Sequence, residues 1–173
     1  EGFRWIHESF GTNWRMTEMQ GVIGRIQLKK MSKWTKLRTD NANILTKTFS
    51  RFSGKDGILE IPQLNTENGC VHAYYKYYVF IRKESLKDGW DRDRIMSEII
   101  SKGVPCFQGS CSEVYLEKAF DNTNFRPKNR LKNAKILGES SLMFLIHPTL
   151  TENEMLEMAS ISTSVFDESI QNK

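Results

Sequence analysis

Hydrophobic residues recur every three or four positions over a long stretch near the start of the chain. The series consists of Met19, Val22, Ile23, Ile26, Met31, Trp34 and Leu37. This spacing is typical of an amphipathic helix and predicts one long helix from Glu18 to Phe52. Thr17 precedes the helix as its N-cap, and Gln20 at the third helical position completes a capping box.

Two glycines interrupt this helix near its start. Gly21 and Gly24 lie three residues apart and therefore share one face. Each costs about 1 kcal/mol of helix propensity relative to alanine. We expect another element to pack very close to this face, and the alternative is a weakly formed first turn.

Short apolar runs alternate with helical patterns in the rest of the chain. Predicted strands cover 58–62, 71–83, 104–107 and 141–146, and predicted helices cover 92–102, 114–119, 129–137 and 152–167. The run 71–83 is the strongest strand because it is rich in Tyr, Val, Phe and Ile. Its aromatic residues occupy both faces, which indicates burial on both sides. Asp91 and Thr151 are the expected N-caps, and Gly103 is the expected helix stop.

Helices and short strands mix here without a strict β–α alternation, which favours an α+β fold. We expect a long N-terminal helix followed by a small, mainly antiparallel sheet packed by helices. Residues 1–52 would form an inter-domain segment with the long helix, and residues 53–173 a small α+β domain. With 173 residues, of which 39% are hydrophobic, the chain is long enough to bury a core.

The chain has a net charge of +4. One cluster of basic residues leaves open an alternative function, the binding of nucleic acid or of a membrane. The cluster consists of Lys29, Lys30, Lys33, Lys36 and Arg38 on the predicted long helix. Such a cluster can make a stand-alone module that binds nucleic acid or an anionic membrane. A solvated helix face is the simpler interpretation, because no nucleic-acid-binding motif accompanies it. No apolar run approaches the roughly 20 residues of a membrane span. We therefore expect neither nucleic acid nor membrane as a partner.

The residues that usually carry metal or nucleophilic chemistry form no motif. The cysteines are Cys70, Cys106 and Cys111, and the histidines are His7, His72 and His147. Their spacing fits neither a zinc site nor H-E-x-x-H, and no G-x-S-x-G elbow is present. We expect no metal site, no catalytic residue in this chain, and free thiols in a reducing, cytoplasmic compartment.

The segment before the long helix is the best candidate for binding. Asn13 and Arg15 occupy alternate positions, so in an extended backbone their side chains share one face. An amide beside a guanidinium can hold a phosphate or a carboxylate. From these residues alone, an ordinary capped helix with two exposed polar side chains is the simpler interpretation.

Four motifs, in order along the chain, resemble those of a known family. Residues 13–28, which read Asn-Trp-Arg-Met-Thr-Glu-Met-Gln and continue to Gln27-Leu28, are similar to N-x-R-M-[ST]-E-x-Q-A-A-x-G-x-x-Q-L. Residues 72–75 are similar to an H-x-[YW]-H strand, and residues 102–105 to a K-G-I-P turn. Residues 147–154 are similar to H-P-x-L-T-E-E-E. The chain thus resembles the DegT/StrS-type sugar aminotransferases, which are pyridoxal-phosphate enzymes of fold type I.

The resemblance implies a C-terminal piece of a longer, homodimeric enzyme. In that family the cofactor is held as a Schiff base by a lysine a few dozen residues before the N-x-R-M segment. No lysine precedes Asn13 here, so we expect the catalytic lysine outside this chain and no activity from the piece alone. The whole enzyme would move an amino group from an amino-acid donor, glutamate, onto a nucleotide-linked keto sugar. Its products would serve surface polysaccharide or glycan biosynthesis.

The resemblance also implies roles for individual residues. Asn13 would reach the pyridoxal phosphate of the partner subunit, and Arg15 its phosphate or substrate region. For Arg15, a structural salt bridge at the interface is the alternative. His72 and His147 would line the cleft that admits the sugar nucleotide. For both histidines, a hydrogen-bonded position at a strand end is an equally good interpretation.

One segment departs from the family pattern. Relatives carry H-Y-x-P-x-H after the K-G-I-P turn, whereas residues 106–113 read Cys-Phe-Gln-Gly-Ser-Cys-Ser-Glu. Gln108 can still supply neutral hydrogen bonds to sugar hydroxyls, and Tyr115 matches the family tyrosine. The change leaves the sugar open. Some relatives carry histidine in place of the lysine and act as sugar dehydratases, and others act as regulators, so these alternatives stay open as well.

Overall fold

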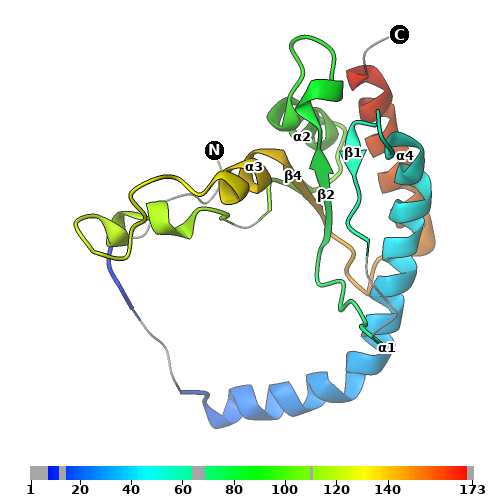
Figure 1. Cartoon of the computed structure of the whole chain (residues 1–173). Helices are drawn as coiled ribbons and strands as arrows, with labels where there is room; N and C mark the ends of the chain where they lie inside the picture. Colours follow the sequence, from blue (N-terminus) through cyan, green and yellow to red (C-terminus); the bar gives the residue numbers. More distant parts are fainter. Residues whose placement is uncertain (1–7, 12–14, 64–68, 110, 171–173) are drawn as a thin grey trace.

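A computed structural model describes residues 8–11, 15–63, 69–109 and 111–170 of the chain (Figure 1). The helices and strands are α1 (Glu18–Phe49), β1 (Leu59–Glu60), β2 (Tyr77–Ile81), α2 (Arg92–Ser101), β3 (Cys106–Phe107), α3 (Lys132–Ser140), β4 (Ser141–Phe144) and α4 (Glu152–Ser169). The predicted α+β class, with a long first helix, is confirmed. The proposed division of the chain at residue 52 stays a prediction.

The strands form one antiparallel sheet in the order β1–β2–β4–β3. Tyr77 of β2 lies opposite Phe144 of β4, and this register places alternate residues of β2 in the core. The strand predicted over 71–83 is wrong in length, because only 77–81 pairs. The expected burial on both sides is also wrong for β2, where Tyr78 and Phe80 are only half-buried.

Phe49 is the centre of the core. Its ring centroid lies 6.2 Å from that of Tyr77, 5.4 Å from that of Phe144 and 5.2 Å from that of Phe166. Tilted and edge-to-face arrangements of this kind add about 0.5–1.5 kcal/mol per pair to the burial of apolar surface. The second half of α1 is thereby fixed against the sheet and against α4.

The first half of α1 projects away from this core (Figure 1). Met19, Val22 and Ile26 are 77%, 58% and 48% exposed. A Cβ atom added to Gly24 would meet nothing within 4 Å, and one added to Gly21 would meet only a sulfur atom at 4.0 Å. The close approach expected at these glycines therefore does not occur among the described residues.

The predicted helix ends are confirmed where side chains define them. Thr17 and Thr151 each cap a helix within a complete capping box, and the Asp91 side chain accepts a hydrogen bond from the third N–H of α2. Gly103 follows α2 with φ of +90°, which glycine adopts without the strain of a Cβ atom.

Residues 111–131, which we call the arm, extend from the sheet without regular helix or strand (Figure 1). The helix predicted over 114–119 is wrong, since two 3₁₀ turns occupy this stretch. The Phe120 ring lies edge-on to that of Phe10, with centroids 5.3 Å apart, and Lys118 donates to Glu8 at 2.6 Å. The arm thus lies beside residues 8–10.

We predict that Phe49→Ala lowers the free energy of unfolding of the 173-residue chain by about 3–5 kcal/mol. The cause is a cavity where the three neighbouring rings now meet. Met19→Ala on the exposed half of the same helix is the control and should change it by less than about 0.5 kcal/mol. Equal urea midpoints for the two variants would contradict this account of the core.

Candidate functional site

Arg15 lies two residues before the cap of α1, and its side chain is exposed. The exposed guanidinium offers planar donors and a fixed charge, which suit a phosphate. Asn13, the other predicted cofactor ligand, lies outside the described residues.

His72 lies in a turn ahead of β2. Its Nδ1 atom accepts a hydrogen bond from the Tyr74 backbone N–H at 2.9 Å, and the two ring centroids are 4.2 Å apart. Tyr74 has φ of +43°, an uncommon value for a residue with a large side chain. The hydrogen bond and the ring contact stabilise this turn. Both side chains line a cavity of about 120 Å³, together with Thr46 of α1 and Tyr78 of β2.

Gln108 follows β3 and is held by residues from two other elements. Its carbonyl accepts a hydrogen bond from the Ser141 hydroxyl at 2.6 Å, and its side-chain oxygen accepts one from Arg92 Nη2 at 3.4 Å. Arg92 is only 5% exposed. Its guanidinium also donates to the carbonyls of Gly138 and Ser141, at 3.2 and 2.8 Å, and to Asp93 Oδ1 at 2.7 Å. Arg92 therefore ties the Gln108 segment to the sheet.

Tyr78 connects the Gln108 segment with the His72 cavity. Gly109 has φ of +91°, and a Cβ atom added there would lie 2.7 Å from Tyr78 Cε1. Only glycine fits this approach. His72 thus lines a cavity with Tyr78, and Gly109, the neighbour of Gln108, approaches the same tyrosine.

Tyr115 lies at the base of the arm. Its hydroxyl donates to Glu113 Oε1 at 2.7 Å and accepts from the Leu131 N–H at 2.9 Å. Glu113 is 4% exposed and also accepts from Arg130, through Nε at 2.9 Å and through Nη2. Hydrogen bonding by Arg130 is the main cause that lowers the pKa of Glu113 to about 2. Burial, and then the Glu113 carboxylate, raise the pKa of Tyr115. The hydroxyl of Tyr115 is therefore engaged in closing the arm.

His147 lies just past β4, beside α1. Its carbonyl accepts a hydrogen bond from Asn41 Nδ2 at 3.1 Å. Its Nδ1 atom lies 2.8 Å from the Thr149 hydroxyl, and its ring centroid is 6.5 Å from that of Trp34. The histidine is exposed and stabilises the turn toward α4.

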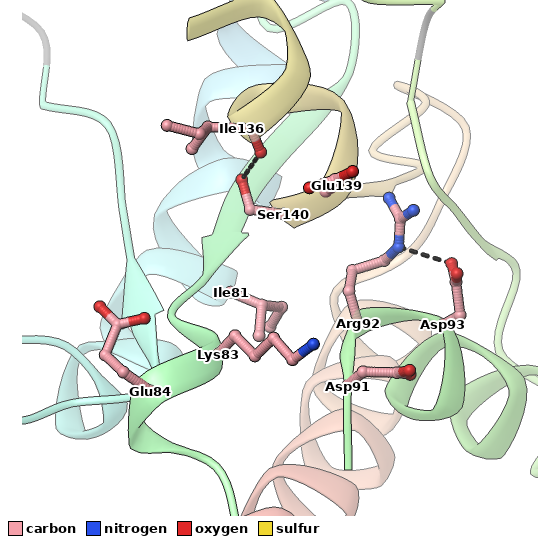
Figure 2. A pocket seen from close by; sticks show the side chains of 9 residues that line it. All are labelled: Ile81, Lys83, Glu84, Asp91, Arg92, Asp93, Ile136, Glu139 and Ser140. Carbon is pink, nitrogen blue, oxygen red and sulfur yellow. Dashed lines mark hydrogen bonds and ion pairs between the residues drawn. The ribbon is translucent and has the colours of Figure 1, made fainter. Parts of the chain in front are cut away.

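Another cavity is lined by none of these candidates, although Arg92 in its wall donates to the Gln108 side chain. It has a volume of about 490 Å³ (Figure 2). Three elements surround it: the 3₁₀ turn at 83–85, the start of α2 and the end of α3. Its lining residues are Ile81, Lys83, Glu84, Asp91, Arg92, Asp93, Ile136, Glu139 and Ser140. Figure 2 shows the Lys83 side chain reaching toward the start of α2. None of the residues predicted to bind cofactor or substrate lines this cavity.

The described part of the chain gives no support for a metal site, a reactive Cys106 thiol or a membrane-spanning helix. No group of three His, Cys, Asp or Glu residues there could hold a metal ion. Burial raises the pKa of the Cys106 thiol to about 12, so this thiol is unreactive at neutral pH. Within the same ranges, every helix is too short or too polar to cross a bilayer.

Sequence reasoning missed Arg92, Glu113 and Arg130. A single charged residue forms no periodic pattern in the sequence. Its structural role becomes visible only when the fold shows which partners it binds. The one available signal is the run of four charged residues at 91–94, which by itself is typical of a solvated surface.

The order of motifs, the fold and the exposed Arg15 agree with a match to a protein family. Residues 1–161 match the model of the DegT/DnrJ/EryC1/StrS aminotransferase family. The chain therefore belongs to this family. No curated protein matches the chain.

Solved structures give the same result. An aminotransferase from Psychrobacter cryohalolentis is 55% identical, with a TM-score of 0.86, over 99% of this chain and 44% of that one. Helicobacter pylori PseC, an aminotransferase involved in the biosynthesis of pseudoaminic acid, is 18% identical (TM-score 0.69; 92% of this chain, 40% of that one). The E. coli GDP-4-keto-6-deoxy-D-mannose-3-dehydratase with bound hydrated PLP is 21% identical (TM-score 0.62; 87% and 36%). The chain spans less than half the length of each.

We predict that Glu113→Gln changes how stability depends on pH. The pKa of this carboxyl is 4.5 before folding and about 2 after it. Its charge thus stabilises the fold above pH 4.5, and this contribution is lost as the pH falls toward 2. The variant should lose about 1–3 kcal/mol at neutral pH and lack this part of the acid dependence.

Urea unfolding between pH 2 and pH 7 measures the effect of Glu113→Gln. Glu157→Gln, a substitution of an exposed residue of α4, is the matched control and should follow the unsubstituted chain. A Glu113→Gln profile parallel to that of the unsubstituted chain would contradict the assigned role of Glu113.

Proposed function

We propose that the full-length protein is a PLP-dependent aminotransferase that moves an amino group from glutamate onto a nucleotide-linked keto sugar. The observation that carries this proposal is the 55% identity to an aminotransferase over 99% of the chain. A sugar substrate is supported by the more distant relatives, one of which acts in pseudoaminic acid biosynthesis and another on a GDP-linked keto sugar. We place the product in surface polysaccharide or glycan biosynthesis.

The residues ahead of α1 fit the phosphate of the cofactor. The guanidinium of Arg15 is exposed and can donate paired hydrogen bonds to phosphate oxygens, and the amide of Asn13 can add one more. PLP, when bound, supplies the electron sink for the reaction. The part of Arg15 and Asn13 is to hold and orient its phosphate, and the lysine that carries the cofactor belongs to the segment before this chain.

A homodimer accounts for the exposed half of α1. Met19, Val22 and Ile26 present apolar side chains to solvent, and burying each fully would stabilise an interface by about 1.5–3 kcal/mol. Gly21 and Gly24 on the same half of the helix have no side chain, so a second subunit can approach the backbone closely at these two positions. In this arrangement Arg15, just ahead of the helix, serves the active site of the other subunit.

The substrate side of the site is formed by His72 and Gln108 around Tyr78, with His147 beside α1. Because His72 Nδ1 accepts a hydrogen bond, the neutral ring carries its proton on Nε2. That proton can be donated to a sugar hydroxyl or to a phosphate oxygen. The amide of Gln108 can both donate and accept. Tyr115 contributes through the position of the arm.

A sugar dehydratase or a regulator is the alternative within the same fold. The similarity to the E. coli dehydratase extends to 87% of this chain but at 21% identity, which establishes shared fold alone. The residue at the position of the cofactor lysine separates the alternatives. A histidine there would exclude the aminotransferase. Because all three cysteines are unpaired, we place the enzyme in the reducing cytoplasm.

We predict that the full-length protein, given PLP, glutamate and a panel of nucleotide-linked keto sugars, forms 2-oxoglutarate and an amino sugar in equal amounts. The 173-residue chain alone should show neither activity nor pyridoxal absorbance, because the lysine is absent. Product analysis by mass spectrometry distinguishes amination from loss of water. Loss of water without amination would establish the dehydratase, and a yellow, borohydride-reducible 173-residue chain would refute the assignment of the lysine.

We predict that Asn13→Ala in the full-length enzyme weakens PLP binding by about tenfold, since one hydrogen bond to a charged phosphate contributes about 1.5–3 kcal/mol. Thermal stability without cofactor should stay unchanged. Asn43→Ala, which removes an exposed amide from the second half of α1, is the control. Equal cofactor dissociation constants for the two variants would remove Asn13 from the site.

A further inference from the structure

A second basic cluster, besides Lys29–Arg38 on α1, lies in a short segment that the proposed chemistry has not used. Residues 122–138 contain no aspartate or glutamate. Their basic residues are Arg126, Lys128, Arg130, Lys132 and Lys135. This charge of +5 exceeds the +4 of the entire chain, so the segment is a local excess and not part of a generally basic surface.

Two of these cations are neutralised by the arm and by α3. Arg126 donates to the carbonyls of Tyr115 and Glu117 and pairs with Asp121 at 2.6 Å. Lys135 lies 3.9 Å from Glu139, one turn along α3. Both residues therefore serve the fold. Arg130 also has a carboxylate partner, Glu113, so among the described residues the charge without such a partner lies on Lys128 and Lys132.

Lys128 and Lys132 are exposed, and no carboxylate within the described ranges pairs with either. Lys132 is also the first residue of α3, which begins without a side-chain cap. A positive charge at this end of a helix is unfavourable, because the helix dipole adds to the local positive potential. An anion bound beside Lys132 would relieve that cost.

Arg130 lies between the two lysines and is held in place. The buried Glu113 carboxylate accepts from its Nε and Nη2 atoms, while the side chain stays 46% exposed. Among the described residues its Nη1 atom has no hydrogen-bond partner, so this atom can bind a ligand. Because the guanidinium is already ordered, less conformational entropy is lost when an anion binds.

The position of the arm favours an anion that belongs to the active site. The arm contacts Glu8 and Phe10, which precede Arg15 by only a few residues. The basic residues 128–132 follow in the same arm, whose Lys118 and Phe120 contact Glu8 and Phe10.

We propose that Lys128, Arg130 and Lys132 form the subsite for the diphosphate of a nucleotide-linked substrate. This inference rests on the proposed function. A diphosphate presents several oxygen acceptors and at least two negative charges to three neighbouring cations. Arg130 orients one phosphate through its planar group, and the lysines act as mobile charges on either side.

The test compares two variants of the full-length enzyme that each lose two positive charges. Lys128→Ala/Lys132→Ala removes the subsite but keeps the contact of Arg130 with Glu113. Lys47→Ala/Lys55→Ala, at exposed positions on α1 and in the loop after it, is the matched control. Calorimetry measures binding of inorganic pyrophosphate, UDP, GDP and dTDP, and steady-state kinetics measures KM and kcat for the nucleotide-linked sugar.

We expect the subsite variant to bind pyrophosphate and its preferred nucleoside diphosphate about tenfold more weakly, with KM raised by a similar factor and kcat within about twofold. The control should match the unsubstituted enzyme, and Lys128→Arg/Lys132→Arg should restore binding. Unchanged pyrophosphate binding in the subsite variant would overturn the proposal, as would an equal loss in the control.

The outcome also separates this inference from the proposed function. An enzyme that aminates a nucleotide-linked sugar with the same KM in the subsite variant would retain the function and lose the subsite. A protein that binds pyrophosphate through these lysines but converts no such sugar would retain the anion site and refute the function.

Discussion

The contact of Phe49 with the sheet and with α4 is the constraint on which the rest of the molecule depends. One ring packs against Tyr77, Phe144 and Phe166, and therefore joins the long helix, both central strands and the last helix. The neighbouring Tyr77 hydroxyl lies 2.9 Å from the Thr46 hydroxyl, and burial raises its pKa to about 12. With this end of α1 fixed, its other end can project and carry Arg15 away from the core.

Two buried charged side chains determine the positions of segments that lack regular secondary structure. Arg92 and Glu113 are each about 95% buried, and burying an unpaired charge would cost several kcal/mol. Each is satisfied by several partners: carbonyls, an amide and Asp93 for Arg92, and Arg130 with Tyr115 for Glu113. These contacts are directional, so they specify one position for the Gln108 segment and one for the base of the arm.

The sequence predicted the elements whose signals are local. Helical spacing and caps gave α1, α2 and α4, because Thr17, Asp91 and Thr151 act within one turn of their own position. The strand predicted over 71–83 is too long, because β propensity does not reveal the turn at Tyr74. The helix at 114–119 was wrong because its conformation is set by Arg126, which binds carbonyls of the arm. The approach of His72 and Gly109 to Tyr78 depends on three separate segments and leaves no local pattern.

The residues that we propose to hold phosphate and the residues that stabilise the fold lie on separate parts of the chain. Arg15 precedes the exposed half of α1, and Lys128 and Lys132 lie at the base of the arm, whereas the aromatic core lies between the sheet and the second half of α1 (Figure 1). The free-energy changes caused by two substitutions are coupled when the side chains touch, and they are additive when the sites are separate. Core substitutions should therefore change the fraction of folded chain, and substitutions in these projecting parts should change anion binding. Glu113 is the exception, because the same buried carboxylate closes the arm and orients Arg130.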